Sequence, residues 1–264
     1  MGHGGSKLAA GTHMPAETAA RGFPRRFDAT FKMSLSRIMA LLTDPNHPDG
    51  PAYAVSWVAG WYGNMIFHGG PTKDHAPLAT ARSAGKLGRD FNVTLPAGPG
   101  AQEQGPGRTE ILRYSPSFRH ETWWFAMQVG GDGPHAAHVE RFEWRRSRGA
   151  EVKAVEGGSG WGLKLVRMGP GSADLGHASA SDDGEDREGP DGPDGRTSDG
   201  KEVVAVWADA GMSLSRMGTL EYRGSGATGE LGLAWSVMAA ATCMCLWQLR
   251  QQRNLAVATT AAAT

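Results

Sequence analysis

The sequence predicts a single antiparallel, β-rich domain wrapped around a buried hydrophobic helix near its C-terminal end. Its 38 glycines and 15 prolines gather between short apolar runs, as turns between strands do. With 40% hydrophobic residues, the 264-residue chain can form one substantial core. Residues 231–249 are apolar on nearly every side, and such a helix must be buried in protein or in lipid.

The N-terminal part is expected to lie outside the β region. Residues 1–31 are small, polar and rich in Gly, Ala and Pro, which predicts a flexible tail. Residues 33–42 place apolar side chains at helical spacing, with Ser34 as a cap and Pro45 as a stop, so a short helix is expected there. The domain itself is predicted to span residues 32–250.

Ten strands are predicted from short runs of β-branched and aromatic residues bounded by turn residues. Within one of them, Phe142 and Trp144 share a face as a half-buried strand requires, and Glu140 interrupts the apolar alternation on that face. The predicted strands are 53–58, 62–67, 78–84, 89–95, 109–114, 121–129, 138–146, 161–168, 201–208 and 216–223.

Two low-complexity stretches interrupt the strands, at residues 96–107 and 169–200. The second contains many carboxylates among glycines and prolines, which raises the question of a calcium site. An EF-hand loop needs ligands at fixed positions and a closing Glu, and this run does not supply them. A disordered acidic insertion at 169–200 is therefore predicted.

The apolar segment 231–249 has two possible environments, the axis of a barrel or a bilayer. About twenty-one helical residues span roughly 31 Å, which suits either one. Its alanines and polar residues such as Ser236, Thr242 and Gln248 favour a helix packed inside a sheet. The alternative is a single-pass membrane protein. Residues 251–264 are predicted to form a C-terminal tail.

Charge and cysteine content limit the partners and the compartment. Lys plus Arg and Asp plus Glu each number 27, so no net field draws the chain to nucleic acid. Cys243 and Cys245 are too close in sequence to staple distant segments, and no secretory signal is evident, which favours an intracellular location. The N-terminal Met-Gly start matches an N-myristoylation pattern at Gly2, although mobile Gly-rich starts are common.

The Gly224–Gly229 segment has the spacing of a dinucleotide-binding loop between a strand and a helix. A Rossmann unit needs a further parallel strand with an acidic residue, and the chain supplies neither. A sharp turn with Thr228 capping the helix is therefore expected. An anion held at the helix start is a weaker alternative, and it would support an enzyme of unknown type.

Metal and cofactor chemistry are not predicted. His135, His138 and Glu140 offer zinc-type ligands, but their spacing fails the H-E-x-x-H template, so a turn histidine and a strand-edge histidine are expected instead. Nucleophile-elbow, Walker A and cysteine-based metal patterns are also missing from the sequence. We therefore expect no cofactor, no metal and no catalytic activity.

The candidate binding residues are Arg141, Arg145 and Arg146, which follow or flank Phe142 and Trp144. Basic and aromatic side chains together can contact an anionic lipid headgroup. A solvated strand end is the structural alternative.

The order of elements resembles the tubby-like superfamily, which includes tubby C-terminal domains, LURP-one-like plant proteins and phospholipid scramblases. The blocks that carry the resemblance, and that are similar to uncharacterised fungal proteins of this type, are residues 60–68, 160–166, 202–208 and 218–232. The resemblance implies a closed barrel of about twelve strands around the terminal helix, so one hairpin beyond the ten strands is expected. It also implies phosphoinositide binding, although no residue-level match to that pocket is found.

The function expected from the sequence is a non-catalytic, intracellular binding or scaffold protein whose ligand is a phosphoinositide or another anionic lipid. It occupies the cytoplasm or the periphery of a membrane. The alternatives are the membrane-anchored protein and the enzyme named above.

Overall fold

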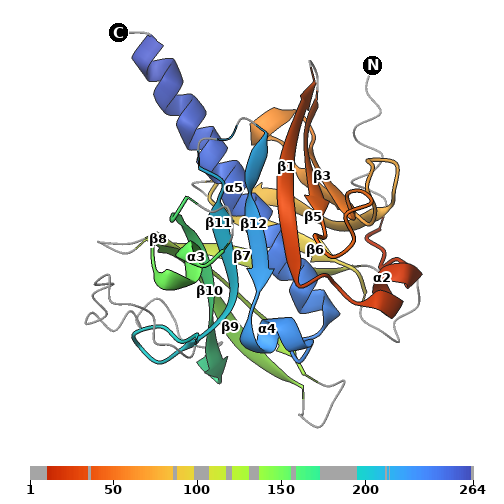
Figure 1. Cartoon of the computed structure of the whole chain (residues 1–264), viewed down its shortest axis with the longest axis vertical. Helices are drawn as coiled ribbons and strands as arrows, with labels where there is room; N and C mark the ends of the chain where they lie inside the picture. Colours follow the sequence, from red (N-terminus) through yellow and green to blue (C-terminus); the bar gives the residue numbers. More distant parts are fainter. Residues whose placement is uncertain are drawn as a thin grey trace.

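The structure is a computed structural model, and Figure 1 shows how strands surround a long C-terminal helix. The residues that it describes are 11–34, 37–85, 88–97, 107–116, 121–130, 137–155, 159–172, 195–211, 213 and 215–262. Gly2 and His135, and most of the acidic insertion, lie outside this described part of the chain.

Twelve antiparallel strands form a closed barrel in which each strand pairs with its neighbours in sequence and β1 pairs with β12. All ten strands predicted from the sequence are present. The strands are β1 (Arg26–Ser34), β2 (Arg37–Thr43), β3 (Tyr53–Trp57), β4 (Met65–His68), β5 (Pro77–Ala84), β6 (Asp90–Leu95), β7 (Arg108–Pro116), β8 (Glu121–Val129), β9 (His138–Ser147), β10 (Gly162–Pro170), β11 (Glu202–Asp209) and β12 (Arg216–Tyr222).

Helix α5 (Leu233–Ala262) fills the barrel. Its residues 235–246 are all buried, so the helix is enclosed on every side over this length. It is fixed to two strands of the wall by hydrogen bonds: Trp144 Nε1 of β9 donates to Thr242 Oγ1 at 2.9 Å, and Tyr222 Oη of β12 donates to the Ser236 carbonyl at 2.6 Å. The prediction of a β-barrel around a buried helix is confirmed, and segment 231–249 is the core of that barrel.

Aromatic rings close the barrel around the point where α5 leaves it. Phe31, Trp57 and Trp247 meet Trp61 of the short 3-10 turn η1 (Gly60–Tyr62), with ring centroids 5.3 to 5.9 Å apart. Gln248 Nε2 also donates to the Trp61 carbonyl at 2.6 Å. Beyond these contacts the helix projects from the barrel, with residues 254–261 exposed.

No helix in the described part of the chain is long and apolar enough to cross a membrane.

The predictions for the N-terminal region are wrong from residue 16 onward. Residues 1–31 were expected to be a tail, but helix α2 (Ala16–Arg21) and strand β1 lie there. The helix expected over 33–42 is instead the end of β1 and strand β2, joined as a hairpin. This is the hairpin missing from the ten predicted strands. The helix was predicted because the adjacent apolar residues Leu41 and Leu42 fit helical spacing. In the structure, Ala40 and Leu42 are the buried positions, two residues apart as in a strand.

Two other boundaries also differ from the sequence prediction. The expected tail at 251–264 is helical through Ala262, because α5 continues beyond the barrel. The expected insertion at 169–200 is partly ordered at both ends: Pro170 ends β10, Thr197 is buried, and Asp199 accepts a hydrogen bond from Arg145 at 3.3 Å. Residues 173–194 of this insertion lie outside the described residues.

Candidate functional site

The barrel has two mouths, and polar side chains gather at each of them on the inward face of the strands. We call them the entry mouth, where the α4–α5 turn leads into α5, and the exit mouth, where α5 leaves. Inward positions recur every second residue along a strand. On β8, for example, the inward face runs from Glu121 at the exit mouth, through Trp123 and Phe125, to Val129 at the entry mouth.

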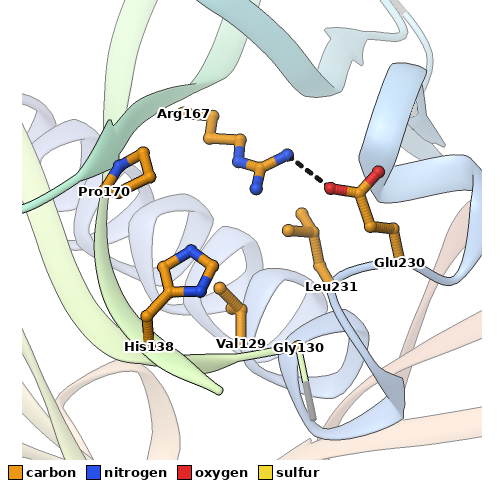
Figure 2. Close-up of a pocket in the computed structure, with 7 residues that line it drawn as sticks. All are labelled: Val129, Gly130, His138, Arg167, Pro170, Glu230 and Leu231. Carbon is orange, nitrogen blue, oxygen red and sulfur yellow. Dashed lines mark hydrogen bonds and ion pairs between the residues drawn. The ribbon is translucent and has the colours of Figure 1, made fainter. Parts of the chain in front are cut away.

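A pocket of about 310 Å³ opens at the entry mouth. Figure 2 shows its lining, in which charged groups face apolar side chains. The lining residues are Val129, Gly130, His138, Arg167, Pro170, Glu230 and Leu231.

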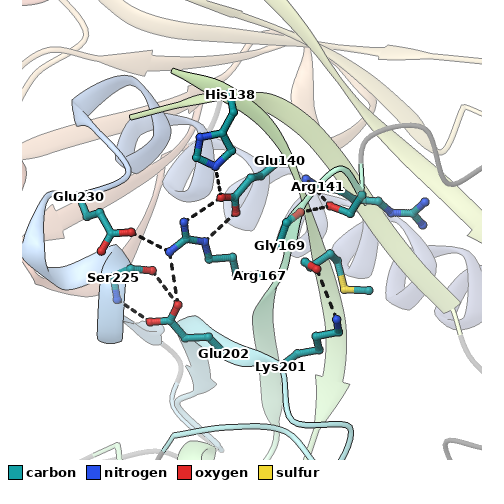
Figure 3. Close-up of polar contacts among 11 residues, drawn as sticks. His138, Glu140, Arg141, Arg167, Gly169, Lys201, Glu202, Ser225 and Glu230 are labelled. Carbon is teal, nitrogen blue, oxygen red and sulfur yellow. Dashed lines mark hydrogen bonds and ion pairs between the residues drawn. The ribbon is translucent and has the colours of Figure 1, made fainter. Parts of the chain in front are cut away.

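Arg167 of β10 organises the polar side of this pocket (Figure 3). Its Nε and Nη2 donate to the two carboxylate oxygens of Glu140 at 2.7 and 2.8 Å, and its Nη1 donates to Glu230 at 2.9 Å. Glu202 lies 3.6 Å from the same Nη1. His138 Nε2 is hydrogen-bonded to Oε1 of Glu140, the oxygen that also accepts from Arg167 Nη2. The guanidinium thus ties β9, β11 and the turn before α5 together.

Glu140 explains the interruption noted in the sequence of β9. It is fully buried on the inward face, beside Phe142 and Trp144. Burial on its own would raise the pKa of Glu140, but hydrogen bonds from Arg167 and His138 outweigh it and hold that pKa below its ordinary value. The hydrogen bonds to Glu140 in turn raise the pKa of Arg167. Both groups are therefore charged at neutral pH, as a buried bidentate pair.

The entry mouth is unsuited to an anion. The guanidinium of Arg167 is already surrounded by three carboxylates, those of Glu140, Glu202 and Glu230. An additional anion would meet an excess of negative charge. The network instead stabilises the start of α5, because Glu230 lies in the turn that leads into this helix.

The Gly224–Gly229 segment forms a short helix, α4 (Gly224–Thr228), with Gly229 in the left-handed conformation at its end. Its first free amide is occupied by a side chain of the barrel: Ser225 N and Oγ donate to the Glu202 carboxylate at 2.7 and 2.9 Å. Gly226 N donates to the Arg223 carbonyl. The amides of Ser225 and Gly226, which a phosphate bound at this turn would require, are therefore already paired.

A different cluster occupies the exit mouth, around Glu121 at the start of β8. Arg253 of α5 donates two hydrogen bonds to the Glu121 carboxylate, at 2.6 and 2.7 Å. Arg146 at the end of β9 and Arg89 before β6 donate at 3.3 and 3.4 Å. Tyr114 Oη of β7 donates to the same carboxylate at 3.2 Å. We call these five residues the exit cluster.

The exit cluster carries an excess of positive charge. Three guanidinium groups surround one carboxylate, which leaves two positive charges in excess. Asp90, which accepts the Tyr114 amide at 2.7 Å, reduces the local excess to one when it is included. Hydrogen bonds from Arg253 hold the pKa of Glu121 below its ordinary value, and the same contact raises the pKa of Arg253.

Exposed apolar side chains also lie at the exit mouth, on η1 and on the projecting end of α5. Tyr62 of η1 is 67% exposed, and Leu255 and Val257 on the projecting end of α5 are 47% and 70% exposed. Gln252 donates to the Trp61 carbonyl, so η1 and this end of α5 are in direct contact. The exit mouth therefore presents arginines and large apolar side chains together.

The three predicted binding arginines do not form one patch. Arg141 and Arg145 lie on the outer face of β9, where both pair with Glu143, and Arg141 also packs on the Trp124 ring at 4.2 Å. Their side chains are only 11% and 18% exposed. Arg146 lies at the exit mouth and is 67% exposed. The prediction of an exposed basic patch thus applies to one of its three residues.

Sequence reasoning missed Arg89 and Arg253. They are 164 positions apart in the chain, and only closure of the barrel around α5 brings both to Glu121. A usable signal was present in β8, where Glu121 begins the alternation that continues through Trp123 and Phe125 and so predicts an inward-facing carboxylate.

Among the described residues, no group of three or more His, Cys, Asp or Glu side chains could hold a metal ion. His138 is instead bound to Glu140. Cys243 and Cys245 are free thiols inside the barrel.

Comparison with known proteins finds no matching family model, no matching curated protein and no matching solved structure. The resemblance to the tubby-like superfamily therefore stays a prediction.

Proposed function

We propose that this protein is a non-catalytic, intracellular binding protein whose exit mouth binds the surface of an anionic membrane. The ligand on this surface is the headgroup of a phosphoinositide or of another anionic lipid. The observation that supports the proposal is the exit cluster, in which three arginines converge on a single carboxylate.

Charge and exposure support this surface over others on the barrel. Basic residues close to an anionic membrane each contribute about 1 kcal/mol to binding. Arg146, Arg89 and Arg253 have side chains that are 67%, 39% and 35% exposed, so a headgroup can reach them. By contrast, Arg141 and Arg145 are held against Glu143 on the outer wall.

The apolar side chains at the exit mouth suit the same partner. Tyr is favoured at the membrane interface, because its ring is apolar and its hydroxyl is polar. Tyr62, Leu255 and Val257 can enter the headgroup region while the arginines contact phosphate groups. Two weak contributions, one apolar and one electrostatic, together give reversible peripheral binding.

Vesicle co-sedimentation tests the proposal. Wild type is compared with the triple variant Arg89→Gln, Arg146→Gln and Arg253→Gln, on vesicles of phosphatidylcholine alone and on vesicles that also contain phosphatidylserine or a phosphoinositide. We expect wild type to bind only the anionic vesicles. The triple variant should bind them at least about a hundredfold more weakly, from about 1 kcal/mol per arginine.

A matched control carries the same change of charge away from the exit mouth. Arg21→Gln, Arg25→Gln and Arg108→Gln remove three exposed arginines from α2, from the residue before β1 and from the start of β7, which lies at the entry end of the barrel. Near-UV circular dichroism confirms that each variant is folded. Equal binding by the triple variant and the control would contradict the proposal.

A further inference from the structure

We propose that Glu121 is an internal ligand of an anion site, and that the phosphate group of a phosphate monoester displaces it when the site is occupied. This inference rests on the proposed function and adds a mode of regulation to it. In the free protein the Glu121 carboxylate occupies the anion site, and the ligand must displace it in order to bind.

The donors around Glu121 form a complete anion site. Its two carboxylate oxygens receive hydrogen bonds from Arg253, Arg146, Arg89 and Tyr114, five in all. Arg89 Nη1 also donates to Tyr114 Oη at 2.7 Å, which orients that hydroxyl toward the carboxylate. Planar guanidinium groups bind carboxylate and phosphate with the same paired donors, so donors arranged for one also suit the other.

The four donor groups come from four different parts of the barrel. Arg89 precedes β6, Tyr114 lies in β7, Arg146 ends β9 and Arg253 belongs to α5. The backbone of each of these elements is held in place independently of Glu121, by strand pairing and by the burial of α5. The donors therefore stay together when the carboxylate leaves.

Charge favours the exchange. Three guanidinium groups face the single carboxylate of Glu121, and with Asp90 included one positive charge remains in excess. A phosphate monoester carries about 1.5 to 2 negative charges near neutral pH and presents three strong acceptor oxygens. It therefore neutralises the arginines more completely than Glu121 does. The Glu121 side chain is 28% exposed, so it can turn toward solvent as the phosphate enters.

Replacing Glu121 by Gln separates this role from that of a structural ion pair. The variant Glu121→Gln keeps the size of the side chain and removes its charge. The side chain at position 121 then competes less strongly with phosphate for the arginines, which are all retained. Its matched control is Glu17→Gln, which makes the same change on the exposed face of α2. Glu121→Asp serves as a second variant, because it keeps the charge but withdraws the carboxylate by one methylene.

The experiment measures binding of inositol phosphate in solution by titration calorimetry, and binding of phosphoinositide vesicles by co-sedimentation. We expect Glu121→Gln to bind inositol phosphate about tenfold more tightly than wild type, since one opposing charge within a few ångströms is removed. Glu121→Asp should show a smaller gain, and Glu17→Gln none. Adding Arg146→Gln and Arg253→Gln to Glu121→Gln should abolish the gain.

The inference is overturned if both Glu121 variants bind inositol phosphate no more tightly than wild type does. Near-UV circular dichroism must show that these variants are folded. The proposed function fails separately, if wild type does not bind anionic vesicles. A gain for Glu121→Gln in inositol phosphate alone supports the inference and assigns the site to a soluble phosphate. A gain in both assays supports it with the lipid headgroup as ligand.

Discussion

Trp144 of β9 donates a hydrogen bond from Nε1 to Oγ1 of Thr242, in the enclosed part of α5, across 98 positions of the chain. Both side chains are fully buried. The Thr242 hydroxyl donates onward to the Met238 carbonyl at 2.8 Å, so each polar atom of this contact is satisfied. This contact fixes α5 against the barrel wall.

Replacing Thr242 by Val should destabilise the protein by about 1 to 3 kcal/mol, because the buried Trp144 N–H loses its acceptor. Valine matches the shape of threonine, so no cavity contributes. The measurement is urea unfolding followed by tryptophan fluorescence. Thr259→Val is the control, since Thr259 lies on the exposed end of α5 and its hydroxyl bonds only to the Leu255 carbonyl. We expect the control to change stability by less than about 0.5 kcal/mol. Equal effects of the two variants would show that the Trp144 contact contributes nothing.

Replacing Arg167 by Met should cost about 3 to 5 kcal/mol at neutral pH, because it removes the guanidinium partner of the buried Glu140 charge and leaves His138 as its remaining hydrogen-bond partner. Arg21→Met, which breaks the exposed pair with Glu17, should cost less than about 1 kcal/mol. Both are measured by urea unfolding.

The same variant should change how stability depends on pH. In wild type the pKa of Glu140 is lowered on folding, so its contribution is present above the unfolded pKa and is lost as the pH falls through the folded pKa. In Arg167→Met the main opposing hydrogen bonds are lost, so burial raises the pKa of Glu140 instead, with only His138 acting against it. The deficit of the variant relative to wild type should therefore shrink as the pH is lowered from about 7 to about 5. A constant deficit over this range would contradict the assignment.

Truncation should separate the two parts of α5. Removing residues 254–264 deletes the exposed end but keeps Arg253 and the enclosed helix, so the barrel should fold with little loss of stability. Removing residues 229–264 deletes the buried side chains of α5 and should abolish near-UV circular dichroism, because the strands lose the core on which they pack. A folded barrel without α5 would refute its role as the core.

The fold class followed from patterns that lie within single segments. Short runs of β-branched and aromatic residues between turn residues, several of them alternating, identified the strands from β3 to β12, and uniform apolarity identified the core of α5. Strand β1 also alternates between apolar and polar residues, since Phe27 and Ala29 are buried and Asp28 between them is not. It was assigned to a tail because its polar neighbours in the first thirty residues dominated the composition. A test for alternation from residue 26 onward would have found it.

The two polar clusters could not be predicted from such patterns, because each depends on contacts between strands. Glu140 stood out as a break in the alternation of β9, but its partner Arg167 lies in β10. Arg146 was identified within a basic run, yet the alternation of β9 places it on the opposite face from Arg141 and Arg145, and barrel closure then places it beside Arg253. Register and closure, which sequence patterns do not encode locally, decide which charges meet.

The central claim, that the exit mouth faces an anionic membrane, is tested most directly by fluorescent probes at the two ends of the barrel. Cys243 and Cys245 are buried and burial raises their pKa, so they should not react with a maleimide dye in the folded protein. A polarity-sensitive dye can then be placed at Val257→Cys near the exit mouth, or at Asp74→Cys in the loop between β4 and β5 at the other end. On adding phosphoinositide vesicles, we predict a blue shift at position 257 and none at position 74. A shift at position 74 alone, or equal shifts at both positions, would contradict the claim.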